Sequence, residues 1–387
     1  MRILVSTGPA YGLYNPVVPI AWALRSAGHQ VLVAGPEPLA AMARTSGLPF
    51  VPTYGPMHMK EVMRHDRSGK EFPNATTDDG QLEQIGRGFG RLAARTLPGM
   101  LQAVDRFRPD LIISEPRAYA AGVAARLRDI PWAQHGVGMH FRPDVEKYGA
   151  DEFRPELEEN GLDGLPEPDM FLDNCPPSVG HKDRDPGRPL RYVPYDPAGT
   201  VPSWSFEKGR RPRLLLTLGT VEPESVGVKR NFGSGVPLFR ELVRVLPEAG
   251  VDLVIAAADP VVEQLGTLSE SVVAAGWISL TSVVPSCDLI VHHVGSGSTM
   301  SGVINGLPQL LLSRNAEHTV NAQLLEEYGS ARQITDQDVE PKEVLDACRA
   351  LLEVPSYKER ATELAAEVAS LPSPAETVAV LEALAGR

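Results

Sequence analysis

A regular alternation of short apolar segments with longer, helically periodic ones constrains the fold of this sequence more than any other feature. The chain opens with RILVST, runs through GPAYGLYNP into the periodic stretch VVPIAWALRSAGH, and then reaches QVLVAG. Strands that are apolar along their whole length are typical of parallel sheets covered by helices on both faces. We therefore predict a strand, a loop, a helix that Gly28 terminates, and a second buried strand.

The alternation runs twice along the chain. PDLIISE and IPWAQH, on either side of the helical stretch AYAAGVAARLRD, extend the first series. A second series begins near Arg213 with RLLLTLGT and continues with VDLVIAAAD, VVAAGW and CDLIVHH. A chain of 387 residues is long enough to split into two domains. The pattern therefore predicts two similar α/β halves.

Three segments set the predicted boundaries. Residues 174–212 are rich in proline and contain few long apolar runs, which is a linker composition. Residues 56–80 are polar and charged, which predicts a long loop, and a last helical stretch follows PSP. The predicted architecture is α/β, with two Rossmann-like domains whose parallel sheets face a central cleft. The predicted domains are residues 1–200, residues 212–372, and a C-terminal helix over residues 373–387 that crosses back to the first domain.

Charge and cysteine content exclude several classes of partner. The net charge is −12 and the pI is near 5.3, so neither nucleic acid nor a membrane is an expected partner. Cys175, Cys287 and Cys348 are odd in number and far apart, which argues against disulfide bonds and zinc sites. No window reaches the roughly 18 apolar residues of a membrane span, and the first apolar run is too short for a signal peptide. We expect a cytoplasmic protein; its oligomeric state stays open, with a homodimer as the default assumption.

The segment CDLIVHHVGSGSTMSGVINGLPQ carries the strongest chemical signal. A predicted strand delivers His292 and His293, and a helix begins in the small-residue turn Gly295-Ser296-Gly297-Ser298-Thr299. Small residues at the start of a helix let backbone N–H groups approach a phosphate, where the helix dipole also favours negative charge. The hydroxyls in this turn and a neutral imidazole supply further donors. This combination predicts a phosphate site.

The same segment and several others resemble the GT-B glycosyltransferases of family 1, in the branch of bacterial natural-product enzymes that attach deoxysugars to polyketides. The branch pattern HHxGxGS/T reads HHVGSGST here, G-x-PQ reads Gly306-Leu307-Pro308-Gln309, and the polar pair before Asn321-Ala322 reads Glu317-His318. The opening GPAYG, CPPS at 175–178, RPRLLLTLGT and AGW also match, so the resemblance covers nearly the whole chain. It implies the GT-B fold for the two predicted domains.

The resemblance also implies a donor site in the second domain. His293 and the turn 295–299 match residues that bind the donor pyrophosphate, Trp277 and Ile278 match those at the nucleobase, and Glu317 and His318 match those at the sugar hydroxyls. The turn after the first strand of this domain adds Thr217, Gly219 and Thr220. The implied donor is a nucleoside-diphosphate sugar (TDP or UDP), with a TDP-deoxysugar expected. Two departures, Val294 for the first motif glycine and His318 for an amide, leave open the turn geometry and the sugar hydroxyls that are recognised.

The first strand–helix loop lacks the histidine that oxygen-glycosylating relatives use as a base. That histidine aligns with Leu13, which cannot accept a proton. Three explanations stay open. A base lies elsewhere, with Glu115 and His135 as leading candidates; or the acceptor is an already nucleophilic ring carbon, as in similar aromatic-polyketide C-glycosyltransferases that also carry an apolar residue here; or the protein is a non-catalytic relative. This loop and a methionine-rich segment predict a lipophilic acceptor site, with candidate residues Tyr11, Leu13, Asn15, Met57, Met59 and His140.

Together these features predict an inverting, metal-independent glycosyltransferase of the hexosyltransferase type. Its acceptor would be a lipophilic natural-product aglycone such as an aromatic polyketide, glycosylated on carbon or oxygen. Donors aimed at the diphosphate stabilise the charge that develops there as the sugar departs. No DxD-like pair stands at a strand end, so neither a metal nor another cofactor is expected. The alternatives are a non-catalytic sugar-nucleotide-binding helper and a GT-B-fold sugar-nucleotide epimerase.

Overall fold

The chain divides into two compact units. The computed structural model describes residues 1–73, 75, 77–139, 143–180, 187–197, 199–219, 235–313, 315–335 and 339–386. Unit 1 comprises Met1–Cys175, His181–Pro197 and Leu371–Arg387, and unit 2 comprises Pro176–Gly180 and Ala198–Ser370. The sequence predicted a first domain over 1–200, a second over 212–372 and a returning helix over 373–387. The structure differs in that 176–180, which include most of the CPPS segment, pack with unit 2.

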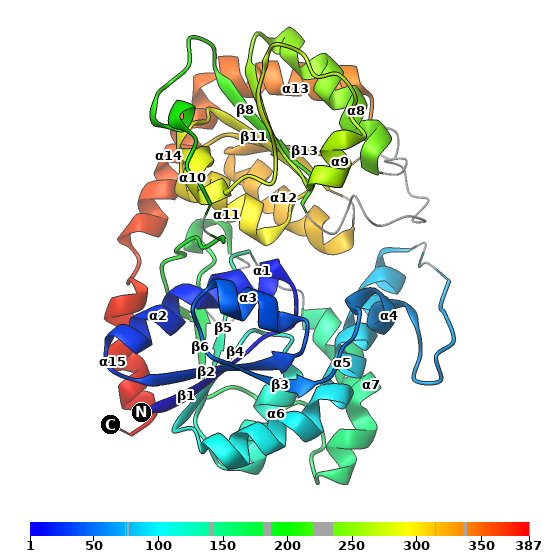
Figure 1. Cartoon of the computed structure of the whole chain (residues 1–387), viewed down its shortest axis with the longest axis vertical. Helices are drawn as coiled ribbons and strands as arrows, with labels where there is room; N and C mark the ends of the chain where they lie inside the picture. Colours follow the sequence, from blue (N-terminus) through cyan, green and yellow to red (C-terminus); the bar gives the residue numbers. More distant parts are fainter. Residues whose placement is uncertain are drawn as a thin grey trace. The chain divides into compact units, whose positions relative to one another are not determined.

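Unit 1 is built on a parallel sheet, with seven strands among the described residues, in the order β3-β2-β1-β4-β5-β6-β7 (Figure 1). Ser6, at the end of β1, pairs with Ser114, at the end of β4. This register places the loops that follow these two strands side by side. The strands are β1 (Arg2–Ser6), β2 (Gln30–Pro36), β3 (Phe50–Tyr54), β4 (Leu111–Ser114), β5 (Trp132–His135), β6 (Met170–Asp173) and β7 (Arg188–Pro189).

Alternate side chains of these strands enter two separate cores, because successive residues of a strand point to opposite faces. Ile3 and Val5 pack with α2 (Val18–Ser26), α3 (Leu39–Thr45) and α15 (Pro374–Leu384). Leu4 packs on the other face with α5 (Asp78–Phe107), α6 (Tyr119–Leu127) and α7 (Pro143–Glu159). The apolar runs of the sequence are thus apolar because both faces of this sheet are covered.

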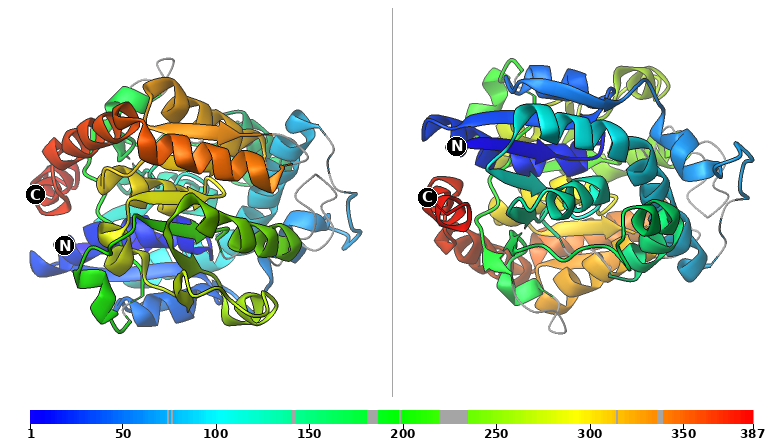
Figure 2. Two further views of the ribbon diagram at one scale, coloured as in Figure 1. Left: turned by 90° about the horizontal axis from the view of Figure 1, so that it is seen from above. Right: turned by 90° about the horizontal axis from the view of Figure 1, so that it is seen from below.

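The two ends of the chain meet in unit 1, as Figure 1 and both views in Figure 2 show. α15 packs against α2. His29 links the ends directly: its Nδ1 lies 3.2 Å from the Met1 amino group, and its Nε2 lies 2.9 Å from Glu382 Oε1. The C-terminal helix therefore belongs to the core of unit 1.

Two segments that the sequence predicted as loops contain helices. GPAYGLYNP forms α1 (Tyr11–Tyr14) and a 3₁₀ turn, η1 (Asn15–Val17), and 56–80 contains α4 (Met59–Arg64) and the start of α5. Thr77 caps α5, since its side chain accepts a hydrogen bond from the Gly80 N–H at 3.2 Å. Asp78 and Asp79, part of the charged composition that suggested a loop, lie in the first turn of α5, where the helix dipole favours them.

Unit 2 repeats the architecture, with six parallel strands among the described residues in the order β10-β9-β8-β11-β12-β13. The strands are β8 (Arg213–Thr217), β9 (Asp252–Ala256), β10 (Val272–Gly276), β11 (Leu289–His292), β12 (Gln309–Leu312) and β13 (Ala331–Ile334). The helices are α8 (Gly235–Val245), α9 (Asp259–Glu263), α10 (Leu280–Val283), α11 (Ser296–Ile304), α12 (Ala316–Tyr328), α13 (Pro341–Glu353) and α14 (Pro355–Ser370).

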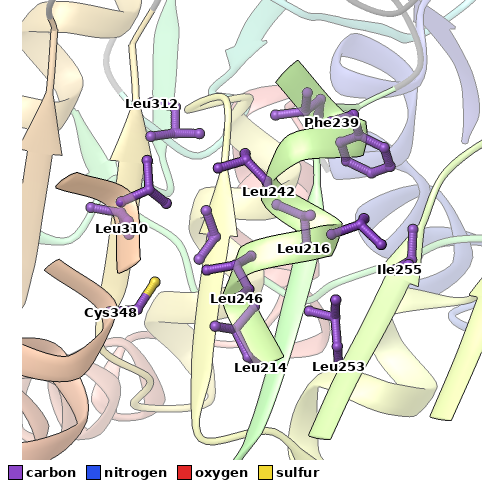
Figure 3. Close-up of a cluster of buried hydrophobic side chains, with 14 of the residues drawn as sticks. Leu214, Leu216, Phe239, Leu242, Leu246, Leu253, Ile255, Leu310, Leu312 and Cys348 are labelled. Carbon is purple, nitrogen blue, oxygen red and sulfur yellow. The ribbon is translucent and has the colours of Figure 1, made fainter. Parts of the chain in front are cut away.

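One face of the unit 2 sheet forms a large leucine-rich core. Leu216 of β8 and Ile255 of β9 pack against Phe239 and Leu242 of α8, while Cys348 of α13 lies in the same cluster (Figure 3). This core fixes β8 and β11 side by side, and with them the two loops that carry most of the predicted donor residues. In the described parts of both units, every helix is too short or too polar to span a membrane.

Candidate active site

The predicted phosphate turn joins β11 to α11 in unit 2. β11 ends at His292, and Gly295 is the N-cap of α11. Backbone N–H groups in a first helical turn have no acceptor within the helix and suit an anion. Thr299 differs from the prediction, because it is fully buried and its hydroxyl donates to the Gly295 carbonyl at 3.1 Å. It therefore stabilises the turn instead of facing a ligand, whereas Ser298 keeps 8% exposure.

The imidazole of His293 lies in a slot between two glycines. A Cβ on Gly219 would overlap the ring at Cε1, and a Cβ on Gly295 would lie 2.5 Å from Nε2. Gly219 has a φ of +73°, which favours glycine, and its N–H donates to Thr217 Oγ1 at 3.2 Å. Both glycines are therefore needed to hold the ring at the start of α11. The structure thus brings together predicted donor residues from the ends of β8 and β11.

The residues predicted to contact the sugar lie at the start of α12. Asn315 caps this helix by accepting the His318 N–H at 2.9 Å. The rings of His318 and His293 pack edge to face, with centroids 5.8 Å apart. Glu317 lies beside His318 in the first turn of the helix. A pair of imidazoles therefore stands where the sequence predicted diphosphate and sugar contacts.

The residues predicted at the nucleobase follow β10, which β9 and β8 separate from β11 in the sheet. Trp277 is 52% exposed, and Ile278 packs against a core cluster beneath it. An exposed indole at the carboxyl end of a strand suits stacking on a base. Thr220, predicted for the donor, and His140, predicted for the acceptor, lie outside the described residues.

Glu115, directly after β4 in unit 1, binds two loops. Its Oε1 accepts from the Gly8 N–H at 3.1 Å, and its Oε2 accepts from the Arg117 N–H at 2.6 Å. Burial raises the pKa of this carboxyl to about 7, although the two backbone hydrogen bonds and the charge of Arg117 act in the opposite direction. A carboxyl that titrates near neutral pH suits a general base.

Leu13 and this carboxyl both approach Gly8. A Cβ on Gly8 would lie 2.8 Å from Leu13 Cδ1 and 3.7 Å from Glu115 Oε1, so the two side chains flank Gly8. A cavity of about 20 Å³ that Thr7, Gly8 and Arg117 help to line has room for one water molecule. The residue in the histidine slot thus approaches the same glycine as the first candidate base.

His135, the other candidate base, is less suited to this role. It ends β5, is 2% exposed, and its Nδ1 lies 2.5 Å from the Gly136 carbonyl, which requires a hydrogen on Nδ1. Burial lowers the pKa of this imidazole to about 4. An imidazole with this pKa holds a proton poorly at neutral pH, so the raised pKa of Glu115 suits a general base better.

The predicted acceptor residues are divided between the loop after β1 and the segment around α4. Tyr11 and Asn15 are half-buried at the start of α1 and in η1. Met57 is 8% exposed and, with part of Met59, packs in the α5 core. The methionine-rich segment therefore contributes to the core of unit 1, because α4 docks on α5; Arg91 fixes it by donating to the Val62 carbonyl at 2.9 Å.

Sequence reasoning missed Asn174, which holds the loop after β5. Its Oδ1 accepts from the Gly138 N–H at 2.7 Å and its Nδ2 donates to the Gly136 carbonyl at 3.0 Å, with the residue 1% exposed. Arg117 was missed too, and its guanidinium lies 5.0 Å from the Phe89 ring centroid. Their place at the ends of β6 and β4 is the signal that could have found them, since carboxyl ends of parallel strands carry functional residues.

Comparison with known proteins finds relatives along nearly the whole chain. The N-terminal and C-terminal domain models of the erythromycin biosynthesis protein CIII-like family match residues 22–219 and 240–384. The L-demethylnoviosyl transferase of Streptomyces niveus is 33% identical over 377 residues, which cover 97% of this chain and 96% of that protein. The structure of the Streptomyces sp. SF2575 glycosyltransferase SsfS6, complexed with thymidine diphosphate, shares 36% identity and a TM-score of 0.86 over 99% of both chains. The spinosyn rhamnosyltransferase SpnG, complexed with spinosyn aglycone, shares 26% identity and a TM-score of 0.84 over 99% of this chain and 100% of its own.

Two Rossmann-like units with parallel sheets, together with the likeness to solved glycosyltransferases over nearly the whole chain, define a glycosyltransferase of the GT-B class. Within that class, the chain belongs to the erythromycin biosynthesis protein CIII-like family of bacterial natural-product glycosyltransferases.

Proposed function

We propose that this glycosyltransferase transfers a deoxysugar from a TDP-sugar to a lipophilic aglycone such as an aromatic polyketide. The observation that carries the proposal is the imidazole of His293, seated between Gly219 and Gly295 at the start of α11. An imidazole N–H and the first-turn amides of a helix offer several donors to one diphosphate. The thymidine diphosphate bound to SsfS6 and the aglycone bound to SpnG support the two classes of ligand.

In the proposed step, an acceptor atom attacks the anomeric carbon from the side opposite the diphosphate. The new bond forms as the bond from this carbon to the diphosphate oxygen breaks, the diphosphate leaves with the electron pair, and the configuration inverts. His293 and the α11 amides stabilise the charge that develops on the diphosphate. The proton of the acceptor passes to the Glu115 carboxylate, directly or through one water molecule. These groups need no metal ion.

The atom that is glycosylated depends on when the proton leaves. A hydroxyl acceptor needs a base during attack, whereas the ring carbon ortho to a phenol attacks first and loses its proton afterwards. Because position 13 is leucine, no imidazole there can accept the proton of a hydroxyl acceptor. The buried Glu115 supplies a carboxylate for either kind of acceptor. Whether the product is a C- or an O-glycoside therefore shows whether the base accepts the proton after the attack or during it.

The test is incubation of the protein with a TDP-deoxysugar and an aromatic polyketide, followed by mass spectrometry and acid hydrolysis of the product. We expect a mass increase of one sugar residue, less product with the matched UDP-sugar, and full activity in excess chelator. Loss of activity in chelator with recovery in magnesium would contradict the metal-free step. Epimerisation of the donor without an acceptor would support the epimerase alternative, and donor binding without product would support the helper.

A further inference from the structure

His292 uses both ring nitrogens in hydrogen bonds within unit 2. Its Nδ1 accepts the Val294 N–H at 3.1 Å, and its Nε2 lies 2.8 Å from Gln309 Oε1. Because a backbone amide can only donate, Nδ1 carries no hydrogen, and Nε2–H donates to Gln309. The ring is completely buried, and this burial lowers its pKa to about 4. The surroundings therefore select one neutral tautomer.

Val294 has a backbone conformation that a valine rarely adopts. Its φ is +66°, in the left-handed region, and its side chain is buried. A β-branched residue in this region is strained and persists only where neighbouring groups hold it. The hydrogen bond from its N–H to His292 Nδ1 is such a restraint.

The strained residue lies between His293 and Gly295, one of the two glycines that form the slot. Val294 joins His293 to Gly295, so its φ decides where the His293 ring and the start of α11 point relative to each other. Gln309 anchors the other side of His292: it begins β12, is 1% exposed, and packs against Gly302 of α11, where a Cβ would lie 2.5 Å from its Cδ. The hydrogen-bonded pair of His292 and Gln309 thus connects β11, β12 and the strained turn.

We propose that His292 is a positioning residue of the donor site, a role that rests on the proposed function. Its unprotonated Nδ1 holds Val294 in the left-handed conformation and so keeps His293 seated between its glycines, facing the donor diphosphate. An apolar side chain of similar size at position 292 would leave Val294 free to relax to negative φ, and the turn would be displaced.

The test compares His292→Asn with His292→Leu, each alone and with Val294→Gly, using thermal unfolding for folding and calorimetry for thymidine diphosphate affinity. Asparagine keeps an acceptor near the Nδ1 position, so H292N should bind within about twofold of the wild type. H292L should bind thymidine diphosphate about tenfold or more weakly, because the strain of one residue in an unfavourable conformation is of that size. Glycine adopts positive φ without strain, so V294G should restore most of the affinity that H292L loses. Equal affinity of H292L and wild type, or an equal loss with and without V294G, would overturn the proposal.

A second measurement does not depend on nucleotide binding. In ¹⁵N-detected spectra of the ligand-free wild-type protein, one histidine should remain neutral and Nε2-protonated at about pH 6, and its signals should vanish in H292N. A charged or Nδ1-protonated His292 contradicts the proposal even where H292L fails to fold. Failure of the wild type to bind thymidine diphosphate, with this tautomer present, contradicts the proposed donor and not the tautomer.

Discussion

The backbone N–H of Gly8 donates to Oε1 of Glu115 over 3.1 Å, across 107 positions of sequence. The bond ties the loop after β1 to the end of β4, two strands that already pair through Ser6 and Ser114. With Arg117 on the other oxygen, both oxygens of the carboxyl are fixed by backbone groups. The proposed base is therefore oriented by the fold itself, and Leu13, where the family resemblance places a histidine, approaches the same glycine.

Glu115→Gln should lower turnover by about 10²–10⁴, the range that a general base contributes. In the wild type, turnover should rise with pH through the pKa of about 7 as the carboxylate form accumulates. The variant should lose this rise and keep its affinity for thymidine diphosphate. Glu158→Gln, at an exposed position of α7, is the matched control. A wild-type pH profile in E115Q would exclude Glu115 as the base.

The same carboxyl should make stability depend on pH. Because its pKa in the folded protein, about 7, exceeds the ordinary value of 4.5, the folded protein binds this proton more tightly than the unfolded chain. Its contribution to stability is therefore largest below pH 4.5 and falls until about pH 7. The difference in free energy of unfolding between wild type and E115Q should fall by up to about 3 kcal/mol over that interval. Denaturant unfolding at several pH values measures it, and a constant difference would mean that the pKa is not raised.

Gly295→Ala should weaken thymidine diphosphate binding through His293 alone. Gly295 has a φ of −61°, which alanine adopts without strain, so the cost comes from the approach of its Cβ to the His293 ring. In calorimetry, G295A should bind weakly, and Gly199→Ala, with no neighbouring atom within 4 Å of the new Cβ, should bind like the wild type. His293→Ala should itself lower turnover by about 10²–10³. When G295A is added to His293→Ala, the affinity for thymidine diphosphate should fall little further. An undiminished effect there would mean that the glycine serves another purpose.

Most of the predicted strands are apolar runs that both faces of a sheet bury, although the partly buried β10 was also predicted and the fully buried β12 was not. β1, β2, β8 and β11 are continuous apolar runs and were predicted, and the fold class followed from them. β3 and β7 contain prolines and lie at or near the sheet edge, where burial is less and the apolar signal weakens. α5 was not predicted, and its start was assigned to the loop at 56–80, because the acidic residues of a helix N-terminus have the same composition as a loop.

The candidate site, like the fold, could be predicted only in part. The phosphate turn is contiguous in sequence, and its small residues have a local physical reason, so it could be predicted. The slot around His293 could not, because Gly219 and Gly295 meet only through the pairing of β8 with β11. The raised pKa of Glu115 also needs three-dimensional burial, and a sequence shows only that a carboxylate follows a strand.

Leu13→His tests whether the missing imidazole can be restored. Leu13 and Glu115 both approach Gly8, so a longer polar side chain at position 13 would be in the neighbourhood of the carboxyl. A neutral histidine there can accept a hydroxyl proton, and the carboxylate stabilises the imidazolium that forms. We expect oxygen glycosylation of a phenolic acceptor to become faster by about tenfold to a hundredfold, a fraction of what an evolved base contributes. Liquid chromatography with acid hydrolysis separates the O- from the C-glycoside.

Leu13→Asn, polar and of similar size but not basic, is the matched control, because Leu13 is only 8% exposed and any polar residue disturbs its packing. The gain should disappear in the double variant with E115Q. An L13H protein that forms no more O-glycoside than L13N would show that the side chain at position 13 does not reach the reacting hydroxyl.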